Sequence, residues 1–447
     1  MYTSYIGKKF LKCYKDAHQK TDDYSAQQFF DEVMFPLFFD DEKHLMHVSN
    51  SPFFQKPRQE DIDKYGSKSH AQYAKLKNAI ENEPPNMSIY VGFAAKDIEG
   101  TTSGQLTDMD FKTDNEEVYA SWIGEALAVG VSGGYVVLID ETEILMAVFD
   151  GWKYYRKYLQ QTPNLKDKQI ETWNGQWLCH AISKRFQKER PFDNFEVETA
   201  EVLGKLAIPT KQWSQIIFVM AQKYPNKVLT VYSYNLSQTN STLGFINLYL
   251  PEVSEMYDLR DKLFIDYKDT ILKDEQIEKL ETFFTFKNAC KLGSIGLKSI
   301  EPAKLREYMP KGSIAYAQGK EFKFTDEKSY YHYSLYKLWI IAMLNKTELL
   351  DLATRLAESL LELEAKRLKD EGKKGNRGKT SLFQDIEDVK TAKNLRGFVE
   401  ALTPLVESGN ADLLANVVEQ VLKMPTDNYP LFITLVGFEY VFLKSKK

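Results

Sequence analysis

The chain has 447 residues, 43% of them hydrophobic and 13% aromatic, which is enough for buried cores and excludes disorder for most of its length. Its formal net charge of −5 excludes a global basic field, so any contact with a polyanion must come from local patches. The three scattered cysteines, together with the lack of an apolar signal segment or a run of ~18–20 apolar residues, predict a reduced, cytoplasmic protein without membrane contact.

Residues 1–85 are predicted to form a helical amino-terminal region. Ser25 and Gln28 have the spacing of a capping box, in which each side chain bonds a backbone amide of the other residue at the start of a helix. Apolar side chains follow on one face, and Pro36 is expected to break or kink this helix. A second helix over 70–82 ends before two prolines, which indicates a domain boundary at residue 85.

Residues 86–330 are predicted to form a mixed α/β body. We expect a strand over 87–95, a hairpin over 133–151 that turns at residues 140–143, and one more hairpin over 312–328. Strands that alternate irregularly with helices favour an α+β fold over a regular series of parallel βαβ units.

Residues 331–447 are predicted to form a carboxy-terminal helical bundle. Leucines recur every three to four positions over 349–363, which is the pattern of one buried helix face. The segment 429–444 is apolar nearly all round and is expected to be the central helix. Between these helices, the stretch 366–381 carries seven Lys or Arg against two acids, and its three glycines predict a flexible basic loop.

One arrangement resembles the centre of a metal-dependent nuclease of the restriction-enzyme type. Such a centre needs two carboxylates to hold a divalent ion and a lysine to orient or activate water. Asp97 or Glu99 would supply the first carboxylate, Asp110 the second and Lys112 the base. The alternative is a solvated hairpin with alternating charge. Mg²⁺ is expected only under the nuclease hypothesis; otherwise we expect no metal site and no cofactor, since the six histidines do not cluster with cysteines.

Three segments are candidates for contact with nucleic acid. In the small-residue loop 100–105, hydroxyl and amide groups can meet base edges or phosphates. In 149–159, aromatic residues interleave with cations, which suits stacking on bases. The basic loop suits a phosphate backbone. The candidate residues are Thr102, Ser103, Gln105, Lys153, Arg156, Lys157, Lys373, Lys374, Arg377 and Lys379.

Each segment also has a purely structural interpretation. The small-residue loop can be an ordinary turn, and the aromatic–basic segment can be an amphipathic helix whose rings lie in the core. The basic loop can be a solubilising linker.

The order of these parts resembles the large subunit of type I CRISPR surveillance complexes (Cascade). The likeness lies in the domain order and in the bundle "NLRGFVEALTPLVESGNADLLANVVEQVLKMPTDNYPLFITLVGFEY" (394–440), which looks like the small-subunit-like bundle of that family. The resemblance implies a non-enzymatic subunit in which Thr102, Ser103 and Gln105 read a short motif in duplex DNA. It also implies that the bundle holds the displaced strand and that the cations of the basic loop hold its phosphates.

We therefore expect a nucleic-acid-binding subunit of a prokaryotic antiviral defence complex, with DNA, guide RNA and other protein subunits as partners. Two alternatives stay open. One is the metal-dependent endonuclease, and the other is a scaffold that binds proteins through tyrosine-rich surfaces.

Overall fold

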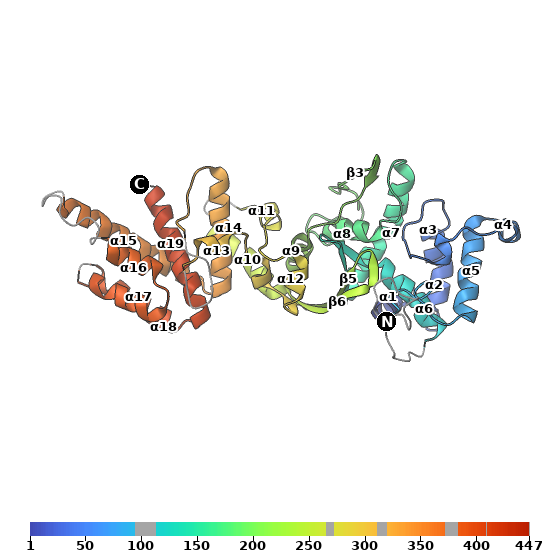
Figure 1. Cartoon of the computed structure of the whole chain (residues 1–447), viewed down its shortest axis with the longest axis horizontal. Coiled ribbons are helices and arrows are strands. Elements are labelled where there is room, and N and C mark those ends of the chain that lie inside the picture. Colours follow the sequence, from blue (N-terminus) through green and yellow to red (C-terminus); the bar gives the residue numbers. More distant parts are fainter. Residues whose placement is uncertain (94–112, 265–271, 311–319, 372–382, 408, 447) are drawn as a thin grey trace. The chain divides into compact units, whose positions relative to one another are not determined.

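The computed structural model describes residues 1–93, 113–264, 272–310, 320–371, 383–407 and 409–446 (Figure 1). The chain divides into two compact units. Unit 1 comprises Met1–Pro251 and Thr285–Ile295, and unit 2 comprises Glu252–Phe284 and Gly296–Lys447. Helices account for 59% of the structure and strands for 9%, with helices at both termini and a sheet between them, so the predicted α+β class is confirmed.

Unit 1 contains a central sheet with helices packed around it. Its helices are α1 (Tyr2–Ala17), α2 (Ala26–Phe29), α3 (Phe35–Phe38), α4 (Gln59–Tyr65), α5 (Lys68–Asn82), α6 (Asn115–Ala126), α7 (Thr142–Gln161), α8 (Ile170–Ala181), α9 (Trp213–Lys223) and α12 (Phe286–Cys290). A π-helical turn, Phe30–Met34, joins α2 to α3, so the helical path continues past Pro36. The wider turn accommodates a residue that has no amide hydrogen to donate.

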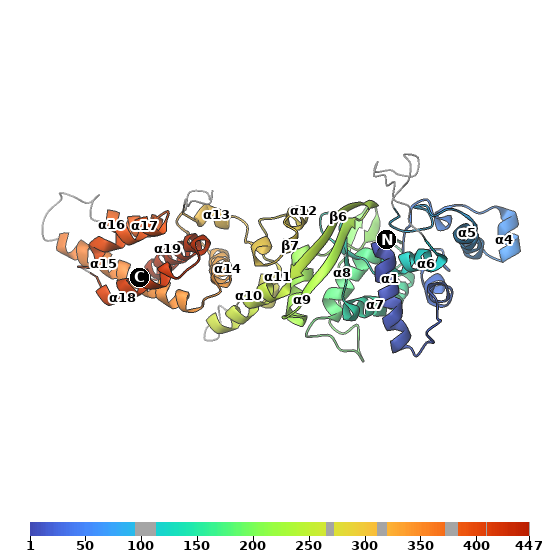
Figure 2. The same ribbon diagram turned by 90° about the horizontal axis from the view of Figure 1, so that it is seen from below.

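The main sheet of unit 1 has the order β1-β2-β5-β6-β7. Its strands are β1 (Val129–Val131), β2 (Tyr135–Ile139), β5 (Val228–Asn235), β6 (Gln238–Tyr249) and β7 (Ser294–Ile295). All neighbours are antiparallel except β6 and β7, which pair in parallel. A separate hairpin is formed by β3 (Ala200–Val202) and β4 (Lys205–Ala207). Figure 2 shows β5 and β6 in front, with α7 and α8 behind them.

The closest helix crossing in unit 1 is made by α1 and α6, and it depends on two glycines. A Cβ at Gly7 would lie 1.9 Å from the carbonyl oxygen of Ala120, and a Cβ at Gly124 would lie 1.9 Å from that of Thr3. Only residues without a side chain allow the two backbones to approach this far. This crossing joins the amino-terminal helices to the sheet within one unit, across the boundary predicted at residue 85.

Unit 2 contains the carboxy-terminal helices. Its elements are α10 (Leu250–Leu263, which begins in unit 1), α11 (Asp274–Glu278), α13 (Leu305–Tyr308), α14 (Glu327–Leu344), α15 (Glu348–Glu371), α16 (Gln384–Thr391), α17 (Leu395–Leu402), α18 (Ala411–Leu422) and α19 (Tyr429–Ser445). The predicted central helix is α19, which contacts α14, α15 and α16. Its side chains Phe432, Ile433, Leu435 and Val436 are fully buried, as the all-round apolar pattern predicts.

Several local predictions are confirmed. The Ser25 hydroxyl accepts a hydrogen bond from the amide of Gln28 (3.0 Å), and the amide of Ser25 donates to the Gln28 side chain (2.8 Å). The helix expected over 70–82 is α5, and the leucine stripe of 349–363 lies on α15. The loop predicted over 366–381 is wrong for its first six residues, because α15 continues to Glu371, and 372–381 lie outside the described residues.

Three strand predictions are wrong for the described residues. The segment 133–151 is no hairpin, because β2 ends at Ile139 and α7 begins at Thr142. Residues 87–93 form turns and a bend in place of a strand. Residues 320–326 contain no strand and lead into α14, while 311–319 lie outside the described residues.

In the described part of the chain, no helix is both long and apolar enough to cross a membrane.

Candidate nucleic-acid interface

Most of the predicted site residues lie outside the part that the structure describes. This applies to Asp97, Glu99, Asp110 and Lys112 of the nuclease hypothesis and to Thr102, Ser103 and Gln105 of the reading loop, all within 94–112. It also applies to Lys373, Lys374, Arg377 and Lys379 within 372–382. Their roles therefore stay predictions, while Lys153, Arg156 and Lys157 on α7 can be placed.

Arg156 is a structural residue, which corrects its assignment to nucleic-acid contact. Its side chain is only 9% exposed, and it pairs with Asp41 at 3.4 Å. Its guanidinium donates to the backbone carbonyls of Leu37 (2.8 Å), Phe38 (3.2 Å) and Lys43 (2.8 Å). With its donors used to fix the 37–43 segment, Arg156 has no free face for a phosphate.

Two of the three rings predicted to stack on bases also lie in the core, while the third, Tyr158, is half-buried. Trp152 and Tyr155 are fully buried, and the ring of Tyr155 stacks on Trp173 at a centroid distance of 5.1 Å. Their spacing on α7 is that of an amphipathic helix with its apolar face inward. Only the opposite face of α7 remains for a ligand.

Lys153 and Lys157 lie on that opposite face, one helical turn apart, and both are exposed. Lys153 borders a hollow of about 510 Å³ that is also lined by the rings of Tyr154, Trp177 and Phe186, by Lys188 and by the carboxylates of Glu143 and Asp150. The hollow lies between α7, the end of α8 and the segment 182–192. We call it the basic–aromatic cleft.

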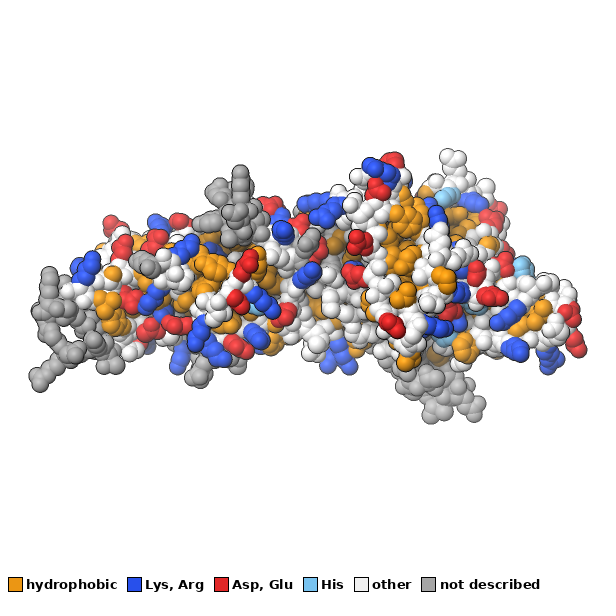
Figure 3. All heavy atoms as spheres, turned by 90° about the horizontal axis from the view of Figure 1, so that it is seen from above, with side chains coloured by type: hydrophobic (Ala, Val, Ile, Leu, Met, Phe, Trp, Pro, Cys, Tyr) orange, Lys and Arg blue, Asp and Glu red, His pale blue; other side chains and the backbone are white. Residues whose placement is uncertain are grey.

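The rings of the cleft form a connected cluster. Tyr154 lies 5.0 Å from Trp177 and 4.8 Å from Phe192, measured between ring centroids, and Trp177 lies 6.2 Å from Phe186. Phe192 is 41% exposed, so part of this cluster faces solvent. Figure 3 shows hydrophobic side chains gathered on the face where α7 and the β3–β4 hairpin lie, with charged side chains of both signs around them.

Gly151 makes room for the deepest ring of the cleft. A Cβ at this position would lie 2.4 Å from the indole of Trp177. The glycine therefore allows Trp177 to pack directly on the backbone of α7, and the Trp177 indole donates to the carbonyl of Ala147 at 2.9 Å. This contact fixes the orientation of the ring that forms the base of the cleft.

The segment 182–192 supplies cations that the sequence analysis did not single out. Residues 184–190 carry four cations and one acid, and Lys184, Arg185 and Lys188 are exposed. His180 anchors this segment, since its Nε2 lies 2.7 Å from the carbonyl oxygen of Pro191. Burial lowers the pKa of His180, so a neutral imidazole donates to that carbonyl. The local run "KRFQKER" could have indicated these cations from the sequence, but the negative net charge of the whole chain obscured it.

The outer face of the sheet carries a second aromatic surface, which lacks such an excess of cations. Tyr232 and Phe245 are cross-strand partners with ring centroids 5.1 Å apart, and Tyr2 of α1 lies 4.9 Å from Phe245. Phe245 is 60% exposed and Tyr5 is 48% exposed. The nearby Lys9 is paired with Asp140. We call this the outer aromatic face.

In the described ranges, no three His, Cys, Asp or Glu side chains gather in a way that could hold a metal ion. Comparison of the chain with protein families, curated proteins and solved structures gives no significant match. Functional inference therefore depends on the residues of this chain alone.

Proposed function

We propose that the protein binds single-stranded nucleic acid in the basic–aromatic cleft of unit 1. The observation that carries this proposal is the juxtaposition of a partly exposed ring cluster with Lys153 and Lys188, which line the cleft, and with Lys184 and Arg185 of the adjoining segment, all four exposed. Rings that stack on bases beside cations that neutralise phosphates are the two components of a general single-strand site.

A single strand fits this chemistry better than a duplex. Bases must be unstacked from each other before they can lie on a protein ring, and they are free to do so in a single strand. Alanine substitution at such rings typically costs roughly 1–3 kcal/mol per stacked base. The cleft cations would add an affinity that depends on salt and not on sequence.

The finer assignment follows the resemblance to the large subunit of type I CRISPR surveillance complexes. Under this proposal the protein is a non-enzymatic subunit of an antiviral defence complex that contacts target DNA and guide RNA. The cleft would hold a single strand, Thr102, Ser103 and Gln105 would read a duplex motif, and Lys373, Lys374, Arg377 and Lys379 would add phosphate contacts.

A second candidate function, a protein-binding scaffold, is favoured by the outer aromatic face. Exposed tyrosine and phenylalanine are enriched where proteins meet. Replacing Phe245 with Asp would then release co-purifying proteins while nucleic-acid binding stays unchanged. Loss of both together would mean that the face serves the nucleic acid instead.

Purification from the native host tests the main proposal. We expect RNA of a defined length to co-purify, and we expect its amount to fall when Lys184, Arg185 and Lys188 are replaced with Ala. Recovery of proteins without any nucleic acid would contradict the proposal and support the scaffold.

The endonuclease alternative has a separate test. Incubation with DNA and Mg²⁺ or Mn²⁺ would give cleavage that Asp110→Ala and Lys112→Ala abolish. We expect no cleavage with either metal. Cleavage that both substitutions abolish would establish the nuclease and displace the non-enzymatic proposal.

A further inference from the structure

Unit 2 contains a pocket of about 380 Å³ between α16, α19 and residues 308–310 and 320–322, within the range of small-molecule sites. Neither the single-strand site nor the scaffold makes use of it. Its lining combines three aromatic rings, three lysines and two carboxylates, which is a set of groups suited to a small polar ligand with a flat part.

Gly437 leaves part of the pocket open because it has no side chain. Gly437 lies within α19 and borders the pocket, and a Cβ placed there would meet no atom within 4 Å. At Gly7, Gly124 and Gly151 a Cβ would clash with a neighbouring atom, so only glycine fits. At Gly437 no neighbouring atom would clash with a Cβ. Since glycine weakens a helix interior, its presence leaves open a space that a larger residue would fill.

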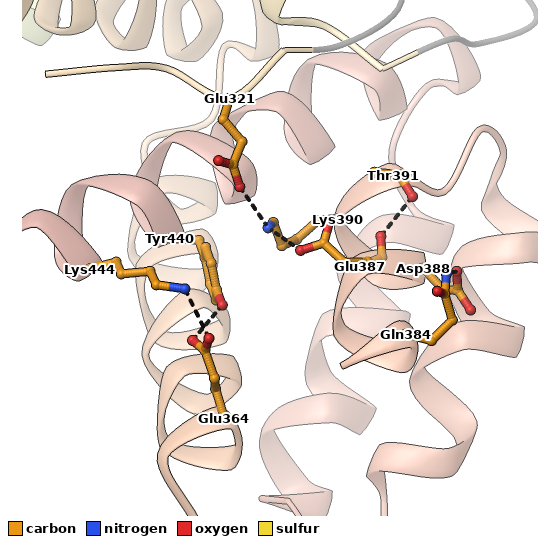
Figure 4. A network of polar contacts seen from close by, with 9 residues as sticks. All are labelled: Glu321, Glu364, Gln384, Glu387, Asp388, Lys390, Thr391, Tyr440 and Lys444. Atoms are coloured by element: carbon orange, nitrogen blue, oxygen red, sulfur yellow. Dashed lines mark hydrogen bonds and ion pairs between the residues drawn. The ribbon is translucent and has the colours of Figure 1, made fainter. Parts of the chain in front are cut away.

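The charged groups of the pocket centre on Lys390. Its side chain is 6% exposed, and its ammonium lies 2.7 Å from Glu387 and 3.6 Å from Glu321. The same ammonium lies 4.2 Å from the centre of the Tyr440 ring. Figure 4 shows Lys390 between the two carboxylates, with Tyr440 and Lys444 both directed to Glu364. Because Glu387 and Glu321 are themselves 48% and 70% exposed, a ligand can reach their oxygens.

The remaining lining supplies a flat apolar wall and two further cations. The ring centroids of Tyr308 and Phe322 lie 4.8 Å apart, and those of Phe322 and Phe438 lie 5.6 Å apart. Lys320 and Lys393 line the pocket and are exposed. Rings accept a flat heterocycle, carboxylates accept hydrogen bonds from sugar hydroxyls, and lysines bind phosphate.

We propose that this pocket binds a nucleoside 5′-monophosphate. The base would lie against Phe322, the ribose hydroxyls would donate to Glu321 and Glu387, and the phosphate would meet Lys393 and Lys320. The proposal is independent of the cleft in unit 1. The same chemistry also occurs at the 5′ end of an RNA strand, so the test includes both forms of the ligand.

Calorimetric titration of the full chain with the four ribonucleoside 5′-monophosphates tests the proposal. At least one should bind with a Kd below about 1 mM, and inorganic phosphate or the corresponding nucleoside alone should bind at least tenfold more weakly. Lys393→Ala should weaken the nucleotide and leave the nucleoside unchanged. A 5′-phosphorylated oligoribonucleotide that binds tenfold more tightly than the free nucleotide would identify a strand end as the ligand.

Filling the pocket provides the structural control. Gly437→Leu should weaken nucleotide binding at least tenfold, and Gly437→Met, whose unbranched side chain also reaches into the pocket, serves if leucine perturbs folding. Gly397→Leu on α17, which does not line the pocket, should bind like the original chain. No binding of any nucleotide at about 5 mM, equal binding by both leucine variants, or phosphate binding as tight as nucleotide binding would overturn the proposal.

Discussion

At the scale of single residues, burial separates neighbouring cations of α7 into different roles. Arg156 is enclosed by backbone carbonyls, while Lys153 and Lys157 reach solvent. Composition alone cannot distinguish them, because all three belong to the same basic run. The distinction depends on the 37–43 segment, more than a hundred positions away in the chain, whose carbonyls need a donor.

This difference predicts unequal costs of substitution. Arg156→Met removes three hydrogen bonds and leaves the part-buried carbonyls of Leu37 and Lys43 without this donor, while that of Phe38 still accepts from the amide of Leu45. The free energy of unfolding should therefore fall by about 3–5 kcal/mol. Lys157→Met, the exposed control, should change it by less than about 0.5 kcal/mol. Urea unfolding measures both values. Similar costs for the two substitutions would show that Arg156 does not hold the 37–43 segment in place.

Two buried carboxyls in unit 1 form a second feature at this scale. Burial raises the pKa of Glu171 to about 8, with a further contribution from nearby Glu125. Burial also raises the pKa of Glu125 to about 7, although the Tyr234 hydroxyl donates to it at 2.5 Å and favours its ionised form. Both groups therefore keep a proton in the folded chain over a range where the unfolded chain releases it.

The raised pKa values fix the sign of a pH effect. Between the unfolded pKa of about 4.3 and the folded value of about 8, the folded state binds more protons, so this contribution to stability is lost as pH rises. Because glutamine does not titrate, the free energy of unfolding of Glu171→Gln should fall less steeply with pH than that of the original chain, by up to about 1.4 kcal/mol per pH unit. The difference in unfolding free energy between the original chain and this variant should fall from pH 5 to pH 8.

Exposed Glu60 of α4 provides the control for this experiment. Glu60→Gln makes the same substitution at an exposed position and is measured at the same pH values. A difference that does not change with pH for Glu171→Gln would show that the pKa of Glu171 is not raised in the folded protein.

At the scale of elements, helix contacts depend on where glycine occurs. At the α1–α6 crossing, Gly124→Ala would force a Cβ to within 1.9 Å of a backbone oxygen, so it should destabilise by at least about 1–3 kcal/mol. In Gly397→Ala, the new Cβ would lie 3.5 Å from a side-chain oxygen of Asn394, which is ordinary van der Waals contact. That change should be neutral or stabilising by up to about 1 kcal/mol. Thermal unfolding of both variants gives the comparison, and equal effects would contradict the close crossing.

The element predictions succeeded where periodicity was strong over a long segment. The leucine stripe of α15 and the apolar run of α19 are examples, because helical spacing over four or more turns has few other interpretations. The prediction of a hairpin over 133–151 was wrong because the second half of this segment has helical spacing and forms the start of α7. Ile144, Val148, Trp152 and Tyr155 recur at helical spacing, while the β-branched residues of β2 just before them suggested that the strand pattern continued.

At the scale of the whole molecule, the sequence did not reveal which segments assemble together. The amino-terminal helices belong to unit 1 through the α1–α6 crossing, and residues 285–295 return to that unit after part of unit 2. These associations join residues far apart in the chain, which local composition does not encode. The division into two units falls at Pro251 and on either side of residues 285–295, and the boundaries predicted at 85 and 330 stay predictions.

The candidate site was predicted in part and for a local reason. The aromatic–basic character of α7 pointed to Lys153 and Lys157, but Trp152 and Tyr155 face the core, while Tyr154 borders the cleft. The cleft arises only when α7, α8 and the 182–192 segment pack together around Gly151 and Trp177. The cations of 184–190 could be read from the sequence, but only folding brings the rings of Tyr154 and Trp177 close to them.

The central claim, that a single strand binds in the basic–aromatic cleft, is tested most directly by the salt dependence of binding. Affinity for a labelled single-stranded oligonucleotide would be measured between about 50 and 200 mM salt for the original chain and for two triple-alanine variants. One variant replaces Lys184, Arg185 and Lys188. The other replaces Lys56, Arg58 and Lys64, which are also exposed and have the same composition.

We predict that the cleft variant binds more weakly and that its log–log salt slope is shallower by about 2, or about 0.7 for each phosphate that is no longer neutralised. The charge-matched control should keep the slope of the original chain. Equal slopes and affinities for both variants would contradict the claim.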